Sequence, residues 1–170
     1  IFWRGYWKGW LEQRPGLWKS YWEVLPSSLE QLNEDPQTKK NYLAACLGET
    51  GIQIYDSWVR ELVETGYLHN HARMWFASIW IFTLKLPWEL GADFFYRHLI
   101  DGDPASNTLG WRWVAGLHTK GKTYLASPSN IIKCASKRLD PSPFNSEGLD
   151  QLNTRGFPIE DVIPASALRF

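Results

Sequence analysis

The stretch from Met74 to Phe82 constrains the fold of this chain more than any other feature. Its sequence, MWFASIWIF, would place apolar side chains around the full circumference of an α-helix. Such a helix has no face suited to water, so it belongs at the centre of a domain. The stretch is also shorter than the roughly 18 to 20 apolar residues of a membrane span. The sequence therefore predicts a buried central helix, and we expect no membrane partner.

Other segments carry apolar residues at three- and four-residue steps, which is typical of the amphipathic helices that would cover such a centre. No segment shows the alternation of a strand. The predicted fold class is all-α, a helical bundle of about seven helices. The helical segments are residues 2–25 around a turn at Arg14–Gly16, residues 27–40 as a short helix and then a loop, and residues 42–47, 52–65, 70–86, 87–99 and 105–116.

The chain from Gly121 onward is rich in Pro, Ser, Gly and Asn, and predicts only short helical turns. The length of 170 residues fits one domain. We expect a helical domain over residues 1–138 and an irregular Pro- and Ser-rich tail over residues 139–170. The first residue is Ile1, without a signal peptide, and Cys46 and Cys134 form no disulfide framework. These features predict an intracellular chain that begins inside a longer protein.

The charges are balanced at 18 basic and 18 acidic residues, so the whole chain has no general attraction for nucleic acid. Residues 104–138 nevertheless contain basic but no acidic side chains, interleaved with Trp111, Trp113 and Tyr124. Such a segment can contact phosphates while its rings stack on bases, and a solvated basic surface is the alternative. The basic residues are Arg112, Lys120, Lys122, Lys133, Lys137 and Arg138.

The aromatic content is unusual, with 11 Trp, 7 Tyr and 8 Phe. Tryptophans at helical spacing usually bury apolar area, and we expect core packing for Trp7, Trp10, Trp18 and Trp22.

Two groups of polar residues are candidates for a site. Asn70, Arg73 and Met74 share one face at the start of the buried helix, where a guanidinium requires a partner. Asp101 and Asp103 lie in a sharp DGDP turn that precedes a helix bearing Asn107, and the amides of that helix start can hold an anion or a polar ring edge. A structural ion pair between Arg73 and a carboxylate is the simpler interpretation.

The sequence offers little support for metal or nucleophilic chemistry. A calcium loop beginning at Asp101 would need Gly and Glu where the chain has Ser106 and Arg112. His69 and His71 have no neighbouring ligands that would complete a zinc site. There is no Gly-x-Ser-x-Gly elbow, phosphate loop or His-Glu-x-x-His motif. We therefore expect no metal.

Four motifs, in this order, closely resemble the FAD-binding helical domain of the photolyase/cryptochrome family. They are TGYLHNHARM at residues 65–74, Trp88, DGDPASN at residues 101–107 and GWRW at residues 110–113, and FWRGYW at residues 2–7 is similar to the family's helix at the substrate cavity. The resemblance covers roughly residues 48–133 and implies that FAD is bound. It implies cofactor-binding roles for Asn70, Arg73, Asp101, Gly102, Asp103 and Asn107.

In that family, an Arg–Asp pair lies beside the flavin, which implies this role for Arg73 and Asp101, with Asp103 at the ring edge and Asn107 facing the reactive nitrogen. Catalytic roles follow for Asn107 and, in electron transfer, for Trp88 and Trp111. The residues that match the cavity for damaged DNA are Trp3, Arg4, Asn70, Met74 and Trp113.

The resemblance implies a flavoprotein of light-driven electron transfer, and a blue-light DNA photolyase that repairs pyrimidine dimers, a carbon–carbon lyase, is the leading hypothesis. A cryptochrome-like photoreceptor without repair and a flavin-free helical scaffold are the alternatives. The family's antenna domain and phosphate-binding loop would lie upstream of residue 1, together with the N-terminal part of the FAD-binding domain.

The chain departs from the family pattern at two places. The outermost tryptophan of the electron relay falls in residues 33–40, which contain no aromatic residue, and Trp80 or Trp75 are the candidates to replace it. His71 stands where the family has an arginine, which removes a permanent cation from the surface expected to face DNA.

Overall fold

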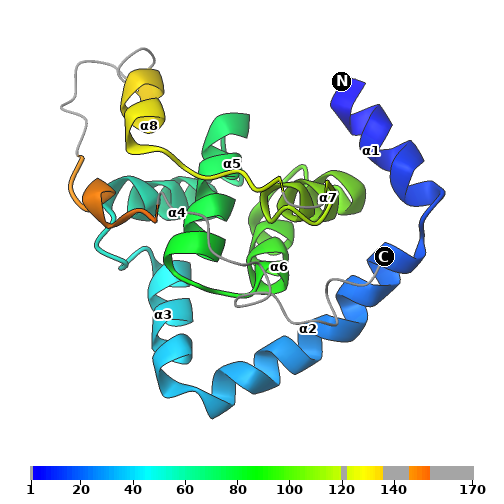
Figure 1. The fold of residues 1–170 in the computed structure, drawn as a ribbon, viewed down its shortest axis with the longest axis horizontal. Helices are drawn as coiled ribbons and strands as arrows, with labels where there is room; N and C mark the ends of the chain where they lie inside the picture. The colour runs from blue at the N-terminus through cyan, green and yellow to red at the C-terminus, as the bar shows by residue number, and fades with distance from the viewer. Residues whose placement is uncertain (1, 120–121, 136–145, 154–170) are drawn as a thin grey trace.

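The computed structural model confirms the all-helical fold (Figure 1). It describes residues 2–119, 122–135 and 146–153, and these contain no strand. Their α-helices are α1 (Phe2–Glu12), α2 (Gly16–Glu34), α3 (Pro36–Leu47), α4 (Gln53–Thr65), α5 (Asn70–Ser78), α6 (Trp88–His98), α7 (Pro104–Val114) and α8 (Pro128–Ala135). A π-helix, η1 (Ile79–Thr83), and a 3₁₀ turn, η2 (Leu149–Gln151), complete the described elements.

The apolar stretch lies at the centre of the fold, as predicted. Phe76, Ile79 and Trp80 have no exposed surface, because α4, α6 and α7 pack around them. The prediction of one continuous α-helix up to Pro87 is wrong, since the helix widens into η1 after Ser78. There the Leu84 amide donates to the Ile79 carbonyl, five residues earlier, over 2.9 Å. This wider turn ends the helix before Pro87 is reached.

The segment expected to be a short helix and a loop is helical almost throughout. Helix α2 continues through Pro26 to Glu34, and α3 begins two residues later. Asp35 caps α3 by accepting a hydrogen bond from the Gln37 amide over 3.0 Å, and Pro36 occupies the first helical position. Both features favour a helix start, so the loop predicted in the later part of residues 27–40 is wrong. The predicted end at Gly48 is confirmed by its left-handed φ of 68°.

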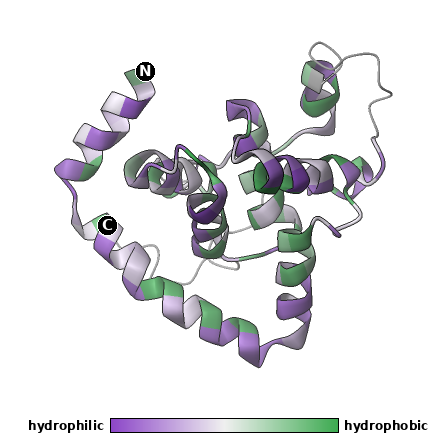
Figure 2. Cartoon of the chain, turned by 180° about the vertical axis from the view of Figure 1, so that it is seen from behind, coloured by the Kyte–Doolittle hydropathy of each residue, from purple (hydrophilic) through white to green (hydrophobic). Residues whose placement is uncertain are grey.

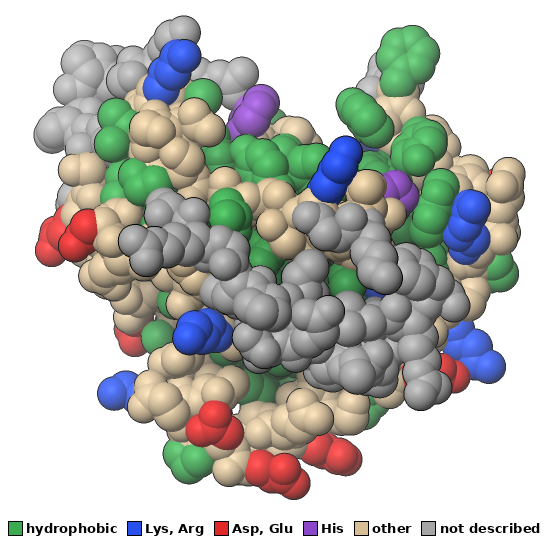
Figure 3. Space-filling view, in the orientation of Figure 1, with side chains coloured by type: hydrophobic (Ala, Val, Ile, Leu, Met, Phe, Trp, Pro, Cys, Tyr) green, Lys and Arg blue, Asp and Glu red, His purple; other side chains and the backbone are tan. Residues whose placement is uncertain are grey.

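Helices α1 and α2 form an arm around one side of the molecule (Figure 1). Helix α2 packs against α6 and α7, whereas α1 packs against α7 and has no buried residue. Figure 2 colours α1 mostly white and purple because tryptophan and tyrosine score low for hydropathy. Figure 3 nevertheless shows apolar side chains along this helix, separated from the main body by a notch. The arm thus faces the body with aromatic rings.

Part of the predicted tail packs onto the domain. Leu149 and Leu152 are buried, and the Gln53 amide donates to the Glu147 carbonyl over 3.1 Å. Gly148 has a φ of 83° and leaves no space for a side chain against the Gly51 carbonyl. Residues 146–153 therefore belong with the core at the start of α4. The rest of the tail, residues 139–145 and 154–170, lies outside the described residues, and the domain boundary at 138 stays a prediction.

Gly91 is required where α6 meets two tryptophans. A Cβ atom at this position would overlap the ring of Trp111 and lie 3.0 Å from the Trp80 ring. We predict that Gly91→Ala lowers the free energy of unfolding by about 1 to 3 kcal/mol, because the rings must move. Chemical denaturation measures the change. Gly9→Ala is the control, since Gly9 has no neighbour within 4 Å and the exchange raises helix propensity. Equal stability changes for both variants would contradict the packing argument.

Candidate functional site

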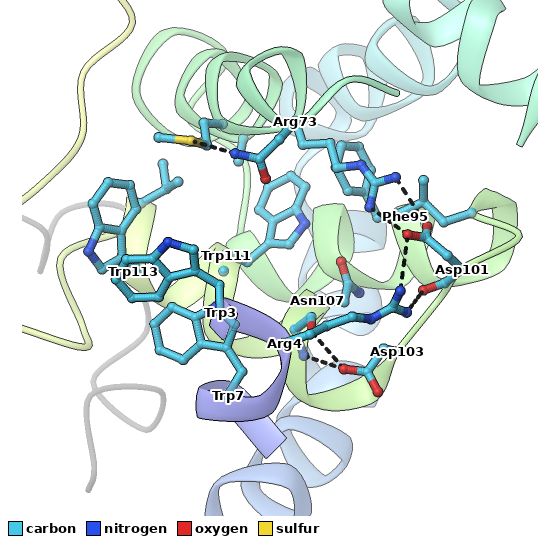
Figure 4. A pocket seen from close by; sticks show the side chains of 17 residues that line it. Trp3, Arg4, Trp7, Arg73, Phe95, Asp101, Asp103, Asn107, Trp111 and Trp113 are labelled. Carbon is cyan, nitrogen blue, oxygen red and sulfur yellow. Dashed lines mark hydrogen bonds and ion pairs between the residues drawn. The ribbon is translucent and has the colours of Figure 1, made fainter. Parts of the chain in front are cut away.

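A cavity of about 560 Å³ lies between α1, α5, α6 and α7 (Figure 4). This volume is within the range of small-molecule and cofactor sites. Most of the residues singled out from the sequence line it, although they come from three separate parts of the chain. They are Trp3, Arg4, Asn70, Arg73, Met74, Asp101, Asp103, Asn107, Trp111 and Trp113. Gly102 and Trp88 do not line the cavity.

Arg73 and Asp101 form the ion pair predicted from the sequence. The Arg73 guanidinium donates from both terminal nitrogens to the Asp101 carboxylate, over 3.1 and 3.4 Å. Its Nε donates to the Leu68 carbonyl over 2.8 Å. Three donors of one side chain are therefore held by fixed acceptors. This geometry aligns the guanidinium plane at the edge of the cavity.

Two basic residues of α1 attach this helix to the same turn. Arg4 donates to the Asp101 backbone carbonyl over 2.9 Å, and Lys8 lies 3.5 Å from the Asp103 carboxylate. Arg4 and Lys8 are one helical turn apart, so they share a face of α1. Arg4 was predicted at the substrate cavity, but Lys8 was not. Its spacing of four residues from Arg4 could have indicated that the two side chains lie on the same face of α1. Together with Arg73, three cations meet two carboxylates.

Asp103 is the N-cap of α7. Its carboxylate accepts hydrogen bonds from the Ser106 amide over 2.9 Å and from the Ser106 hydroxyl over 2.7 Å. Desolvation acts to raise the pKa of Asp103, but these hydrogen bonds and the charge of Lys8 outweigh it and lower the pKa below its ordinary value. One amide of the helix start is therefore occupied. The contact with Ser106 was not predicted from the sequence, although Asp is a preferred residue at the N-cap of a helix.

Asn107 is fixed in orientation by α6. Its side-chain nitrogen donates to the Ala92 carbonyl over 2.7 Å, which commits the amide to this backbone. The carbonyl oxygen of the same side chain then points toward the cavity (Figure 4). The cavity therefore contains a fixed hydrogen-bond acceptor one turn into α7.

Aromatic and apolar side chains form the remaining walls. Trp111 is 3% exposed and packs edge-on against Phe95, with 5.1 Å between ring centroids. Its indole nitrogen is buried and has no hydrogen-bond partner. Figure 4 shows Trp3, Trp7 and Trp113 together on one side of the cavity, away from the Arg73–Asp101 pair. The cavity thus has a charged side and an aromatic side, and Trp7 lies in its wall although core packing was expected.

Trp88 lies outside the cavity in the core between α2, α6 and α7. It is 1% exposed, its ring centroid is 5.8 Å from that of Tyr21, and the Arg112 guanidinium is 5.6 Å from it. Glu89 beside it has no exposed surface.

Gly102, which also lies outside the cavity, leaves no room for a side chain, because an added Cβ would approach two backbone carbonyls to 3.1 Å. The turn between Asp101 and Asp103 is therefore tight.

The basic segment does not form one continuous surface among the described residues. Arg112 is buried, contrary to its expected place on a basic face, whereas Lys122 and Lys133 are exposed. Lys120, Lys137 and Arg138 lie outside the described residues. The phosphate-binding role of this segment therefore has no support from Arg112.

The histidines have local structural contacts. His69 caps α5 through its Nδ1, which accepts from the His71 amide over 3.3 Å, and the two rings stack. Within residues 2–119, 122–135 and 146–153, no three His, Cys, Asp or Glu side chains form a possible metal site. None of the described helices is both long and apolar enough to cross a membrane.

Comparison with known proteins identifies the family. The sequence profile of the FAD binding domain of DNA photolyase matches residues 1–143. The chain belongs to this family of FAD-binding domains. Its cofactor is accordingly FAD. No solved structure matches the chain at a significant level.

Curated relatives share this assignment. The deoxyribodipyrimidine photo-lyase of Alkalihalophilus pseudofirmus is 41% identical over 93 residues, which are 55% of this chain and 19% of the relative. The proteins of the same name from Vibrio cholerae and Escherichia coli are 34% and 31% identical, and each comparison covers 73% of this chain and 26% of the relative. The chain thus spans about a quarter or less of the length of these relatives.

The buried Glu89 predicts an unusual pH dependence of stability. Desolvation raises the pKa of its carboxyl to about 7, although the charge of Arg112 opposes this. Between an ordinary pKa of 4.5 and this value, the folded state binds more protons than the unfolded state. We predict that the free energy of unfolding falls by about 1 to 3 kcal/mol as the pH rises through this window. Denaturation at several pH values measures it.

Glu89→Gln should remove this slope because the amide cannot ionise. Glu64→Gln is the control, since Glu64 is exposed on α4. A slope that persists unchanged in Glu89→Gln would show that another group causes it.

Proposed function

We propose that this chain forms the flavin cavity of a photolyase-type enzyme, which uses light to split pyrimidine dimers in DNA. The observation that carries the proposal is the arrangement around one cavity of the Arg73–Asp101 pair, the Asn107 carbonyl oxygen and the Trp111 ring. The relatives named deoxyribodipyrimidine photo-lyase support the substrate class. FAD supplies the one-electron chemistry on absorbing light.

The residues of the cavity fit a flavin. The three cations at the Asp101–Asp103 turn exceed the two carboxylates, so this side of the cavity favours a ligand that carries negative charge. The Asn107 oxygen is available to accept a hydrogen bond from a ring N–H of the cofactor. Arg73, Asp101 and Asn107 would hold and orient the ring in this arrangement.

Two of the three remaining predicted cofactor contacts, Asp103 and Gly102, act less directly. Asp103 keeps its carboxylate on Ser106 and Lys8, and so would fix the end of α7 beside the flavin edge. Gly102 would permit the tight turn that sets the spacing of the two aspartates.

The aromatic side of the cavity suits a pyrimidine dimer that is flipped out of the DNA duplex. Trp3 and Trp113 provide flat apolar surfaces for bases that have left the DNA stack. Asn70 lines the same cavity, and its side-chain nitrogen is 3.7 Å from the Met74 sulfur. Trp3 is 72% exposed, which leaves its ring accessible to a large substrate. The protein would thus bind the lesion on one side and the flavin on the other.

A photoreceptor without repair activity is the second candidate function. It is favoured by His71, which is exposed in the first turn of α5. His71 lacks the permanent charge with which an arginine would bind DNA phosphate. Trp111 would serve as electron donor in either function, with Trp88 as the next donor, and Trp111→Phe would then slow flavin photoreduction.

The flavin cavity is tested by Asp101→Ala. This change leaves Arg73 without its carboxylate and loosens α1, and we predict that FAD affinity falls more than about thirty-fold. Asp93→Ala is a matched control, because Asp93 also pairs with an arginine, Arg97, over 2.7 Å but lies outside the cavity. Fluorescence titration with FAD measures both. Unchanged FAD affinity in Asp101→Ala would reject the assignment.

Repair is tested by the binding of DNA that contains a pyrimidine dimer. We predict that Trp113→Ala and Asn70→Ala each lower the affinity for such DNA, by about tenfold for the loss of the indole, while FAD remains bound. Trp10→Ala controls for loss of a tryptophan outside the cavity. If the parent protein binds damaged and undamaged DNA equally, the photoreceptor function is favoured over repair.

A further inference from the structure

The aromatic residues of α2 suggest how an electron from the protein surface reaches Trp88. Trp18, Tyr21 and Trp22 form a compact group that we call the α2 cluster. Core packing was expected for Trp18 and Trp22, but the Trp22 ring is 44% exposed. The exposed part of a large apolar ring contributes little to stability. The position of Trp22 therefore calls for another explanation.

Short steps connect Trp22 with the buried Trp88. The ring centroids of Trp88 and Tyr21 are 5.8 Å apart, and those of Tyr21 and Trp22 are 5.5 Å apart. Trp18 stacks on Tyr21 at 5.4 Å and lies edge-on to Trp22 at 5.6 Å. Rings in contact extend without interruption from the core to the surface, and every member except Trp88 belongs to α2.

The charges around Tyr21 stabilise a positive hole on this route. Burial is the main reason that the pKa of Tyr21 is raised, and the carboxylates of Asp93 and Glu89 on α6 raise it further, while Arg97 opposes them. The two carboxylates favour a positive charge on the Tyr21 ring. Arg112 from α7 faces Trp88 and disfavours a positive charge there. A hole would therefore move away from Trp88 toward the α2 cluster. Tyr21 cannot retain it, because its buried hydroxyl has no hydrogen-bond partner to take the proton.

We propose that Trp22 is the terminal electron donor of the relay, connected to Trp88 through Tyr21. The inference rests on the proposed function, because the hole on Trp88 would come from the light-excited flavin by way of Trp111. One electron passes from Trp22 to the oxidised Trp88, and the Trp22 Nε1 proton goes to water. The neutral Trp22 radical remains until an external thiol returns one electron and one proton and is itself oxidised.

This route takes the place of the outermost relay tryptophan that the sequence lacks. A second route of rings leads from Trp111 to Trp80 at 6.1 Å and on to Tyr42 at 5.9 Å. Trp80 has no exposed surface, and burial raises the pKa of the Tyr42 hydroxyl, so neither side chain readily releases a proton to water. The exposed Trp22 is the better terminus for this physical reason.

The test is transient absorption of the FAD-loaded protein after a blue flash. In the parent, a long-lived tryptophan radical is expected. In Trp22→Phe, the hole stays buried and returns to the flavin, so the radical lifetime should fall about tenfold or more. Trp10→Phe removes a tryptophan outside the route and should match the parent. A parent-like lifetime in Trp22→Phe overturns the proposal, and a collapse in Trp80→Phe instead would assign the route through Tyr42.

A second readout identifies the oxidised residue directly. Under illumination in air, dioxygen traps the radical, and peptide mass spectrometry should find oxygenated Trp22 that is absent in the dark and absent in Trp88→Phe. Oxygenation confined to Tyr42 would overturn the proposal. Trp111→Phe separates the proposed function from the proposed route. If flavin photoreduction requires Trp111 but not Trp22, the function stands and only the route to Trp22 is wrong. A parent whose bound flavin is never photoreduced contradicts the proposed function, and this route with it.

Discussion

The Asp101–Asp103 turn is the point where the charged parts of this structure meet. Asp101 binds Arg73 of the central helix through its carboxylate and Arg4 of α1 through its backbone carbonyl. Asp103 binds Lys8 of α1 and begins α7 by capping it. Because α1 has no buried residue, these contacts and its aromatic packing position it against the body. The turn thus joins α1, α5 and α7 around the cavity.

The cavity has two chemically different sides for the same reason. The turn gathers cations on one side, while the outer part of α1 and the end of α7 bring Trp3, Trp7 and Trp113 to the other (Figure 4). A charged, planar cofactor and an apolar, flat substrate can therefore lie next to each other. Buried aromatic residues behind Trp111 connect this region with the core, and Gly91 allows their close approach.

The sequence predicts the helices and the cavity residues better than the contacts between helices. Asn70, Arg73 and Met74 are three and four residues apart, and Asp101 to Asn107 lie in one short turn and helix, so local spacing places each set correctly. The role of Lys8 depends on how α1 docks, and the burial of Arg112 depends on α2 and α6. These long-range contacts have no local pattern. The loop predicted within residues 27–40 is helical because Asp35 caps α3 and Pro36 suits its first position.

The most direct test of the account is the absorption spectrum, from the near ultraviolet to the blue, of the longest natural form of this chain purified with FAD present. The account predicts a bound flavin spectrum that bleaches under blue light, because Trp111 in the cavity wall would donate an electron to the excited flavin. A folded protein that remains colourless after incubation with FAD would contradict it, and the cavity between α1, α5 and α7 would then serve only as part of a helical scaffold.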